Sequence, residues 1–376
     1  MFKVGVIGGG QLARMMHPQA IALGIELRVF SEAENSSAHA ATTQVGDYTK
    51  LAELREFAAD VDVITFDHEH VPIALLENLE QSGVSVQPPS KALTHAQNKL
   101  VMRRRLSELG LPQPAWRSIT SAADLDDFLN QQGGKAIVKT PIGGYDGRGV
   151  RIASSAADIS DWLENLDSYG GSLLAEQLVD FKRELAQLSA RTPSGEFRHW
   201  PVVQTVQENG VCSEVIAPAP APVDHQAAVD IAKRVAEGLG VTGVLAVELF
   251  ETESGELFVN VLAMRPHNSG HFSIEAAVTS QFEQHLRAVL NLPLGETELV
   301  APAAVMINLL GVDDANSFVE HYPAAMERFP QAKFHSYQKA ARKGRKMGHI
   351  AVVGDDADEL LRVGRAARDV LYNRGA

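Results

Sequence analysis

The sequence K-T-P-I-G-G-Y-D-G-R-G occupies residues 139–149, directly after the apolar, strand-like run 136–138. Four glycines lie within its last seven residues, and glycine lets a backbone turn its N–H groups toward an anion. Lys139 and Arg148 add positive charge, whereas Asp146 would repel a phosphate unless it serves a second, amine-bearing ligand. No G-K-[ST] follows, so the segment is not a Walker loop. It predicts either a phosphate-binding loop or a glycine-rich hairpin tip.

Length and composition limit the class of protein. The 376 residues predict two to three domains, and 45% hydrophobic with 22% charged residues indicate large cores rather than disorder. The net charge of −13 argues against general binding to nucleic acid or to an anionic membrane. The single cysteine, Cys212, excludes an internal disulfide and a thiolate zinc cluster. Without a signal-peptide pattern or a long apolar run, we expect a soluble cytoplasmic protein.

The N-terminal region predicts a βαβ unit of a parallel sheet. Residues 2–7 indicate a buried strand, residues 8–11 a turn into a helix, and residues 26–30 a second strand. The turn also satisfies the dinucleotide pattern G-x-G-x-x-A, with Glu32 at the end of the next strand. A nicotinamide-dependent oxidoreductase is therefore an alternative, although a monophosphate ester would suit this helix N-terminus equally well.

Residues 61–110 lead from this region into the next. A strand over 61–66 ends in Asp67-His68-Glu69-His70, which favours ligand contact and only weakly a metal site. A linker follows, and residues 93–110 are expected to form a helix that carries Lys99. The run Arg103-Arg104-Arg105 is interpreted as a solvated face without function.

Polar residues interrupt two apolar strands farther along the chain. Glu176 and Gln177 lie in the strand-like run 172–179, with Glu184 five residues beyond it. Glu248 lies in the apolar run 244–250, where a carboxylate is costly unless it is paired, bound to a cation or on a wet face. A hairpin leads to the return strand 257–262. The segment after it, residues 263–271, is rich in donors and suits a small anion.

The last segment contains a predicted strand over 304–310 and a basic cluster. Lys339, Arg342, Lys343, Arg345 and Lys346 give five cations within eight residues. The cluster fits a solvated edge or a nucleic-acid patch, but the glycines within it favour a turn around a phosphate.

The order of these motifs resembles the ATP-grasp ligases. Within them it is similar to the family that carboxylates 5-aminoimidazole ribonucleotide in purine biosynthesis, over essentially the whole chain. The motifs that carry the resemblance are G-G-G-Q-L at 8–12, G-G-Y-D-G-R-G at 143–149, R-P-H-N-S-G-H at 265–271, S-Q-F-E with H-L-R at 280–287, and G-R-K-M-G-H at 344–349.

The resemblance implies an α/β (α+β overall) architecture of three domains. These are a Rossmann-like preATP-grasp domain over 1–92, an ATP-grasp domain of two clamping subdomains over 93–298, and a small C-terminal domain over 299–376. It also implies the reaction: ATP, bicarbonate and 5-aminoimidazole ribonucleotide give 5-(carboxyamino)imidazole ribonucleotide, ADP and phosphate, through carboxyphosphate. A homodimer is expected.

The resemblance also implies roles for individual residues. The expected ATP-binding residues are Lys99, Lys139, Gly144, Tyr145, Asp146, Gly147, Arg148, Gly149, Glu176, Gln177, Leu178, Val179, Glu184, Gln207 and Asn260. Those expected to hold the ribonucleotide are Gln11, Leu12, Glu69, Lys339, Arg345 and Lys346. The catalytic set is Asp146, which would face the substrate amine, together with Lys339 and the bicarbonate site of Arg265, His267 and Asn268.

The expected metal site departs from the family pattern. Glu248 and Asn260 are expected to bind magnesium, of which the family uses two ions, but Val261 stands where the pattern has a glutamate. Valine cannot ligate a hard cation. The chain is therefore either an altered but active enzyme or a protein that binds ATP and ribonucleotide with impaired turnover.

Overall fold

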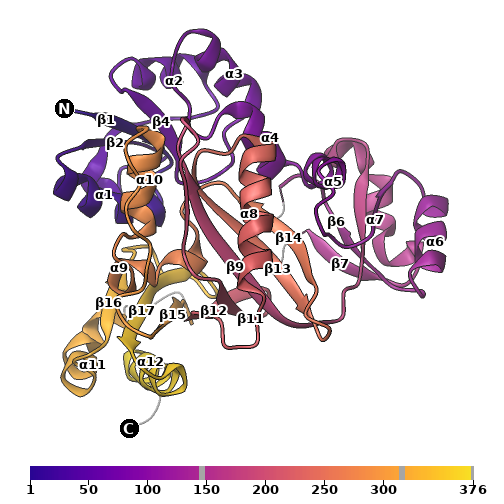
Figure 1. Ribbon diagram of the computed structural model, residues 1–376. Helices are drawn as coiled ribbons and strands as arrows, with labels where there is room; N and C mark the ends of the chain where they lie inside the picture. Colours follow the sequence, from indigo (N-terminus) through magenta and orange to yellow (C-terminus); the bar gives the residue numbers. More distant parts are fainter. Residues whose placement is uncertain (144–148, 313–317, 374–376) are drawn as a thin grey trace.

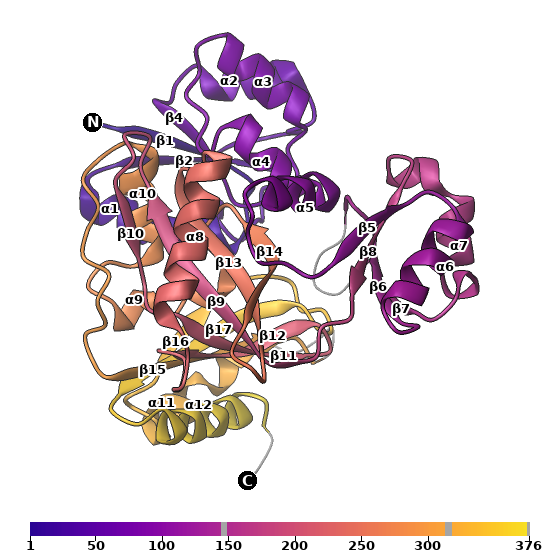
Figure 2. The same cartoon turned by 45° about the vertical axis from the view of Figure 1, so that its right-hand side comes forward.

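The computed structural model describes residues 1–143, 149–312 and 318–373, which form three sheets with their covering helices (Figure 1). The expected loop residues Gly144, Tyr145, Asp146, Gly147 and Arg148 lie outside these ranges. The N-terminal sheet and a small sheet lie at two corners of the molecule, and the C-terminal residues form a third (Figures 1 and 2). A long sheet runs between them.

The N-terminal sheet is four-stranded and parallel, in the order β3-β2-β1-β4. Its neighbouring strands β1 and β4 are short apolar runs buried on both faces, as parallel strands between helices require. This confirms the predicted βαβ unit. The elements are β1 (Lys3–Ile7), α1 (Gln11–Leu23), β2 (Glu26–Ser31), η1 (His39–Ala41), β3 (Thr42–Val45), α2 (Leu51–Ala58), β4 (Val63–Phe66) and α3 (Ile73–Gln81).

The segment expected as one helix over 93–110 is two helices. α4 (Ser90–Gln97) ends at Asn98, and α5 (Lys99–Glu108) begins directly after it. The Asn98 side chain accepts hydrogen bonds from the backbone N–H groups of Leu100 and Val101, so it caps the second helix and ends the first. The turn brings the N-terminus of α5, with Lys99, beside Pro141, whose carbonyl accepts the Lys99 N–H at 2.9 Å.

The small sheet has a core of its own and carries the strand before the glycine loop. Its four strands lie in the order β5-β8-β6-β7, and Phe128 and Trp162 are buried against them from α6 and α7. The elements are β5 (Trp116–Ile119), α6 (Ala122–Gln131), β6 (Ala136–Lys139), β7 (Val150–Ala153), η2 (Ala156–Ile159), α7 (Ser160–Glu164), η3 (Leu166–Tyr169) and β8 (Leu173–Gln177).

The long sheet is nine-stranded and joins the middle of the chain to its end. Its order is β14-β13-β9-β11-β12-β15-β17-β16, with β10 paired to β9. The elements before residue 299 are β9 (Phe181–Arg191), β10 (Phe197–His199), β11 (Val203–Glu208), β12 (Val211–Ala217), α8 (His225–Leu239), β13 (Gly243–Thr252), β14 (Leu257–Ala263), η4 (Asn268–Gly270), α9 (Ser273–Ala276) and α10 (Gln281–Val289).

The C-terminal strands extend this sheet without a break. β15 pairs antiparallel with β12, placing Glu214 opposite Ile307, so backbone hydrogen bonds cross the predicted division at 298/299. The predicted domain boundaries stay predictions, but all the strands described after residue 299 belong to this sheet. Its elements are β15 (Ala303–Leu310), η5 (Phe318–His321), α11 (Tyr322–Arg328), β16 (Lys333–Ser336), β17 (Lys346–Gly354) and α12 (Ala357–Leu371).

Candidate active site

Two adjoining cavities lie where the three sheets meet. The first, of about 660 Å³, lies between the small sheet and β9, β13 and β14. The second, of about 810 Å³, lies between the ends of the N-terminal strands and residues 339–346. Both are lined by a common wall of seven residues: Glu69, Ala96, Lys99, Arg265, His267, Asn268 and Lys346. A ligand in one cavity can therefore reach a ligand in the other.

A buried charge network forms one end of the first cavity. Lys139, at the end of β6, places Nζ 2.6 Å from Glu176 Oε2, and Arg103 Nε lies 2.5 Å from Glu176 Oε1. Burial by itself would raise the pKa of Glu176, but Arg103 and Lys139 outweigh it and hold that pKa below its usual value. The carboxylate therefore stays ionised and fixes Lys139 at the cavity.

Arg103 corrects the interpretation of the arginine run. Its side chain is fully buried, and besides Glu176 it donates to the carbonyl oxygens of Val259 at 2.7 Å and Asn260 at 2.8 Å. It thus joins α5, β8 and β14 behind the cavity. Arg104 is exposed, whereas Arg105 is half-buried and donates to the Gly238 carbonyl at 3.0 Å. The sequence interpretation was wrong for Arg103, because three consecutive arginines give no pattern that indicates which of them faces inward.

Lys99 and Asn260 complete the cationic end. Burial, with a smaller contribution from Lys139, lowers the pKa of Lys99 to about 8. Asn260 Oδ1 lies 3.3 Å from Lys139 Nζ. Lys99 is the first residue of α5 and Lys139 is the last residue of β6 in the small sheet, so the two lysines reach this end of the cavity from different elements. Such a pair suits the negative charge of a polyphosphate.

The other end of the first cavity is apolar with a few acceptors. Leu178 and Val179 follow β8, and the stacked rings of Phe181 and Phe250 lie 4.6 Å apart on β9 and β13. Burial raises the pKa of Glu184, which the neighbouring Gln207 partly offsets through a hydrogen bond. An apolar slot beside polar groups accepts a flat ring with a hydroxylated substituent.

The acidic corner of the first cavity is the candidate metal site. Glu248 on β13 and Asn260 on β14 both line the cavity, and Val261, also in the lining, offers no ligand atom. Glu248 Oε1 lies 3.4 Å from His267 Nε2. Among the described residues, no three His, Cys, Asp or Glu ligand atoms cluster at this cavity. Within the ranges that the structure describes, the oxygen ligands of Glu248 and Asn260 fit one hard cation that also binds phosphate oxygens, but they are too few for two cations.

The common wall is held by hydrogen bonds from several elements. Glu69, at the end of β4, accepts from the Met264 N–H at 2.9 Å and from Arg265 Nε at 3.0 Å. Gln281 accepts from the His267 N–H and donates to the His267 carbonyl, both at 2.8 Å. Burial, with Arg265 and Lys346 nearby, lowers the pKa of His267 to about 3. This histidine is neutral at physiological pH, so the positive charge of the wall comes from Arg265, Lys99 and Lys346.

The second cavity brings the N-terminus and the C-terminal segment together. The Lys339 ammonium donates to Gln11 Oε1, and Arg14 donates to the carbonyl oxygen of Ser336 at 3.1 Å. The turn with Arg345 is closed by Gly344, whose φ is 75° and whose N–H donates to the Gly311 carbonyl at 2.7 Å. Arg342, Lys343 and Lys346 also line this cavity. The cationic turn predicted from the sequence therefore faces a ligand-sized space.

The Gly8–Gly10 turn is occupied by carboxylates of the chain itself. Glu32 Oε2 accepts the Gly9 N–H at 3.3 Å, and its other oxygen lies 3.0 Å from His68 Nε2. This hydrogen bond to His68, opposed by burial, lowers the pKa of Glu32 to about 2. Asp67 Oδ1 accepts the Ala13 N–H at 2.8 Å, at the start of α1. The acceptors that a dinucleotide or a phosphate would supply are already present, which disfavours the oxidoreductase alternative.

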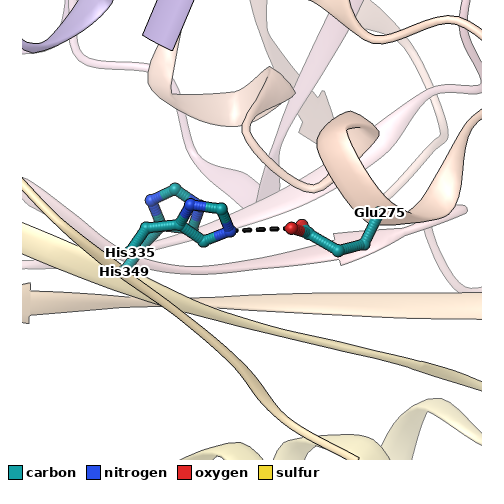
Figure 3. A group of neighbouring side chains, drawn as sticks. All are labelled: Glu275, His335 and His349. Carbon is teal, nitrogen blue, oxygen red and sulfur yellow. Dashed lines mark hydrogen bonds and ion pairs between the residues drawn. The ribbon is translucent and has the colours of Figure 1, made fainter. Parts of the chain in front are cut away.

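A cluster of Glu275, His335 and His349 lies outside the cavities (Figure 3). Its possible ligand atoms lie within 4.8 Å of one another, but the two imidazole rings are stacked 4.2 Å apart at an angle of 9°. Nearly parallel rings direct their lone pairs along lines that do not converge on one ion. His335 Nε2 instead contacts Glu275 Oε1 at 2.7 Å, which ties β16 to α9.

The structure thus places the predicted residues as follows. The first cavity alone is lined by Lys139, Glu176, Gln177, Leu178, Val179, Glu184, Gln207, Glu248 and Asn260. The second alone is lined by Gln11, Leu12, Lys339 and Arg345, and both are lined by Glu69, Lys99, Arg265, His267, Asn268 and Lys346. Gly149 is described at the end of the loop, with its carbonyl accepting the Thr140 N–H at 2.9 Å. Sequence reasoning missed Arg103, whose position no local pattern reveals, and it gave Asp67 and Gln281 no role of their own although both lie in motifs named above.

Comparison with protein families defines the class of protein first. An ATP-grasp domain matches residues 104–282, a ribonucleotide synthetase preATP-grasp domain residues 1–97, and a phosphoribosylaminoimidazole carboxylase C-terminal domain residues 304–363. Fold and site are those of an ATP-grasp protein with the flanking domains of a ribonucleotide synthetase. No helix in the described part of the chain is long and apolar enough to cross a membrane.

Individual relatives then define the family. The N5-carboxyaminoimidazole ribonucleotide synthase of Mycobacterium tuberculosis is 51% identical over 95% of this chain and 85% of its own, and that of Corynebacterium ammoniagenes 46% over 98% and 92%. The structure of the Aspergillus clavatus enzyme with ADP and 5-aminoimidazole ribonucleotide has a TM-score of 0.88 at 33% identity, covering 99% of both chains. The chain belongs to the N5-carboxyaminoimidazole ribonucleotide synthase family.

Proposed function

We propose that this chain carboxylates 5-aminoimidazole ribonucleotide with ATP and bicarbonate, releasing ADP and phosphate. The observation that carries the proposal is the common wall of two cavities, in which Arg265, His267 and Asn268 face both. A bicarbonate held at this wall lies between a nucleotide in the first cavity and an amine in the second. One bound anion can then meet both partners in turn without leaving the site.

The chemistry needs two transfers. A bicarbonate oxygen attacks the γ-phosphorus of ATP, the bond to the β-phosphate oxygen breaks, and ADP leaves with carboxyphosphate formed. The ribonucleotide amine then attacks the carboxyl carbon, phosphate departs, and the amine loses a proton. Arg265 stabilises negative charge at the bicarbonate, and the neutral His267 supplies a hydrogen bond without a competing positive charge.

In the first cavity, Lys99 and Lys139 contact the nucleotide phosphates. Glu176 acts on the nucleotide through Lys139, with which it is paired. The segment 177–179 also holds the nucleotide, and Glu184 and Gln207 lie at its ribose. Gly144 to Gly149 would close over the phosphates, and Asp146 would face the amine. These loop roles rest on the sequence, because residues 144–148 lie outside the described ranges.

In the second cavity, Gln11, Leu12, Glu69 and Lys339 hold the ribonucleotide, with Arg345 and Lys346 at its phosphate. Lys339 reaches the site from the C-terminal unit and Gln11 from the N-terminal helix, and the two are already hydrogen-bonded. A ribonucleotide that contacts both would therefore join the two ends of the chain. Lys346 lines both cavities, so it also serves the nucleotide side.

Glu248 and Asn260 would hold magnesium beside the nucleotide phosphates. A bound ion neutralises charge that develops on the transferring phosphoryl group. Because Val261 contributes no oxygen, we propose that the protein residues hold one ion firmly rather than two. The homodimer and the cytoplasmic location are further proposals, which rest on family membership and on the acidic, single-cysteine composition.

The test of this function is ADP formation by the chain with each substrate omitted in turn. The proposal expects ADP release that requires bicarbonate and rises when aminoimidazole ribonucleotide is added. If calorimetry shows binding of ATP and of the ribonucleotide but no ADP is released, the alternative of a binding protein with impaired turnover is favoured. Val261 at the position of the magnesium-ligand glutamate motivates this alternative. NADH oxidation in place of ADP release would contradict both.

A second test restores the carboxylate that the family pattern has at position 261. Val261→Glu should raise ADP formation by at least about tenfold, because a further ligand stabilises charge that grows during transfer. ATP affinity should change less, since ATP brings magnesium with it. Val261→Gln, which has the same length without the charge, is the control. Equal rates in all three proteins would mean that the second carboxylate is dispensable here or replaced by another residue.

A further inference from the structure

Asn308 contacts Asn268 of the common wall, but Asn308 itself lines neither cavity. It lies on β15, only 2% exposed, and its side chain faces that of Asn268. Asn268 Nδ2 donates to Asn308 Oδ1 at 3.0 Å, and Asn308 Nδ2 donates to Asn268 Oδ1 at 2.7 Å. The two amides thus form a closed, doubly hydrogen-bonded pair between β15 and η4.

A third hydrogen bond decides which way both amides face. Asn308 Nδ2 also donates to the backbone carbonyl of Cys212 at 2.8 Å. A carbonyl can only accept, so the nitrogen end of Asn308 must face it, and both hydrogens of that nitrogen are then used. Asn308 must consequently offer its oxygen to Asn268 Nδ2. The orientation of the Asn268 amide therefore follows from the main chain of β12.

This orientation determines what Asn268 offers to a ligand. One hydrogen of Asn268 Nδ2 and one lone pair of Oδ1 are used within the pair. The second hydrogen of Nδ2 has no partner among the described residues, and Asn268 lines both cavities. The wall therefore presents an N–H donor beside Arg265. A donor fits an oxyanion, whereas the reverse orientation would present a carbonyl oxygen that repels it.

We infer that Asn308 is a positioning residue that holds Asn268 as a hydrogen-bond donor to the bicarbonate and to the carboxyphosphate formed from it. The inference rests on the proposed function for the identity of the anion, but the orientation itself does not. The same arrangement couples the wall to the sheet strand β12, whose residue Cys212 lines the nucleotide cavity. Asn308 itself touches no substrate and acts only through Asn268.

Two variants test this. Asn308→Asp keeps the shape and the acceptor but removes both donors, so Asn268 loses the bond that fixes its oxygen. Asn308→Leu removes all three hydrogen bonds. Both should raise the KM for bicarbonate by about tenfold, the effect of one misplaced hydrogen bond to a charged group, with the KM values for ATP and ribonucleotide changed less than about twofold. A merely structural role would change all three constants together or none.

Gln284 provides the matched control. It is another fully buried amide, and it makes two hydrogen bonds of 2.8 Å with the backbone of Gly295, away from both cavities. Gln284→Leu should lower the unfolding temperature as Asn308→Leu does, without a selective change in the KM for bicarbonate. A selective rise in this control as large as that in the Asn308 variants would overturn the inference.

A structural measurement keeps the inference testable apart from turnover. Crystal structures of the Asn308→Asp and Asn308→Leu variants should show the Asn268 side chain rotated away from its wild-type position or in two conformers. An unchanged Asn268 in both would overturn the inference, whatever the kinetics. If the unmodified chain shows no bicarbonate dependence, the proposed function fails, and the crystal structures still decide whether Asn308 positions Asn268.

Discussion

The two cavities hold their positive charge in different ways. In the nucleotide cavity, Lys139 is buried and paired with Glu176, which is itself held by the buried Arg103. In the ribonucleotide cavity, Arg345 lies in a turn that is fixed through the backbone of Gly311, and Arg342 beside it is exposed. The first site is organised by side-chain ion pairs and the second by the course of the main chain.

This difference has an energetic consequence. Buried charges are stable only as a network, so removing one member leaves its partners without compensation. Charges on a half-exposed turn remain hydrated, and each interacts with a ligand nearly independently. Substitutions in the nucleotide cavity should therefore affect folding and binding together, whereas those in the ribonucleotide turn should affect binding alone.

The largest effect is expected from Glu176→Gln. This variant leaves Arg103 fully buried without a carboxylate, which should lower the free energy of unfolding by on the order of 3–5 kcal/mol and weaken ATP binding as well. Urea unfolding with and without ATP measures both. The predicted loss of ATP affinity follows because Lys139 is no longer held at the cavity.

Glu214→Gln is the matched control for that variant. Glu214 is also buried and forms a two-fold ion pair with Arg365, but the Arg365 side chain is half exposed and can return to water. We expect a loss of about 1–2 kcal/mol and unchanged ATP binding. If Glu176→Gln cost no more than Glu214→Gln, the proposed contrast between a buried network and a hydrated pair would be wrong.

A smaller effect is expected in the ribonucleotide cavity. Arg345→Ala should weaken ribonucleotide binding by about 1–3 kcal/mol, as for a charge-assisted hydrogen bond, with ATP affinity and unfolding nearly unchanged. Calorimetry with each ligand measures this, and Arg328→Ala, on α11 outside the cavity, is the control. For Lys346→Ala we expect both ligands to bind more weakly, because Lys346 lines both cavities. Equal weakening of both ligands by Arg345→Ala would count against the assignment.

The same contrast explains what could be predicted from the sequence. The glycine turns and the basic turn 339–346 were recognisable because main-chain sites need local patterns of glycine and charge. Arg103 was misinterpreted and Asn308 was not noticed, since each acts through a partner distant in sequence. The helix break at Asn98 was also missed, although asparagine is a common cap. The continuous sheet across residue 299 depends on strand pairing, which no local pattern encodes.

The smallest effect concerns pH and Lys99. Burial lowers the pKa of this ammonium group to about 8, below its usual value, so in the free protein it loses its charge as the pH rises through 8. ATP favours the charged form, so ATP affinity should be fully present well below pH 8, decline as the pH rises through 8, and fall by at most about tenfold between pH 7 and 9. Calorimetry in buffers of different ionisation enthalpy should detect proton uptake above pH 8. Lys99→Met should bind ATP more weakly and without this uptake; an unchanged pH profile would exclude Lys99 as a phosphate contact.

Isotope transfer from bicarbonate to phosphate shows whether bicarbonate at the common wall attacks ATP. In a single turnover with the chain in excess over ATP, oxygen-18-labelled bicarbonate and aminoimidazole ribonucleotide are added, and the released phosphate is analysed by mass spectrometry. The released phosphate should carry one oxygen from bicarbonate, and this label should be lost when carbonic anhydrase first exchanges the bicarbonate oxygens with water. ADP formed together with unlabelled phosphate would mean that water attacks the nucleotide, and it would contradict the proposed role of Arg265, His267 and Asn268.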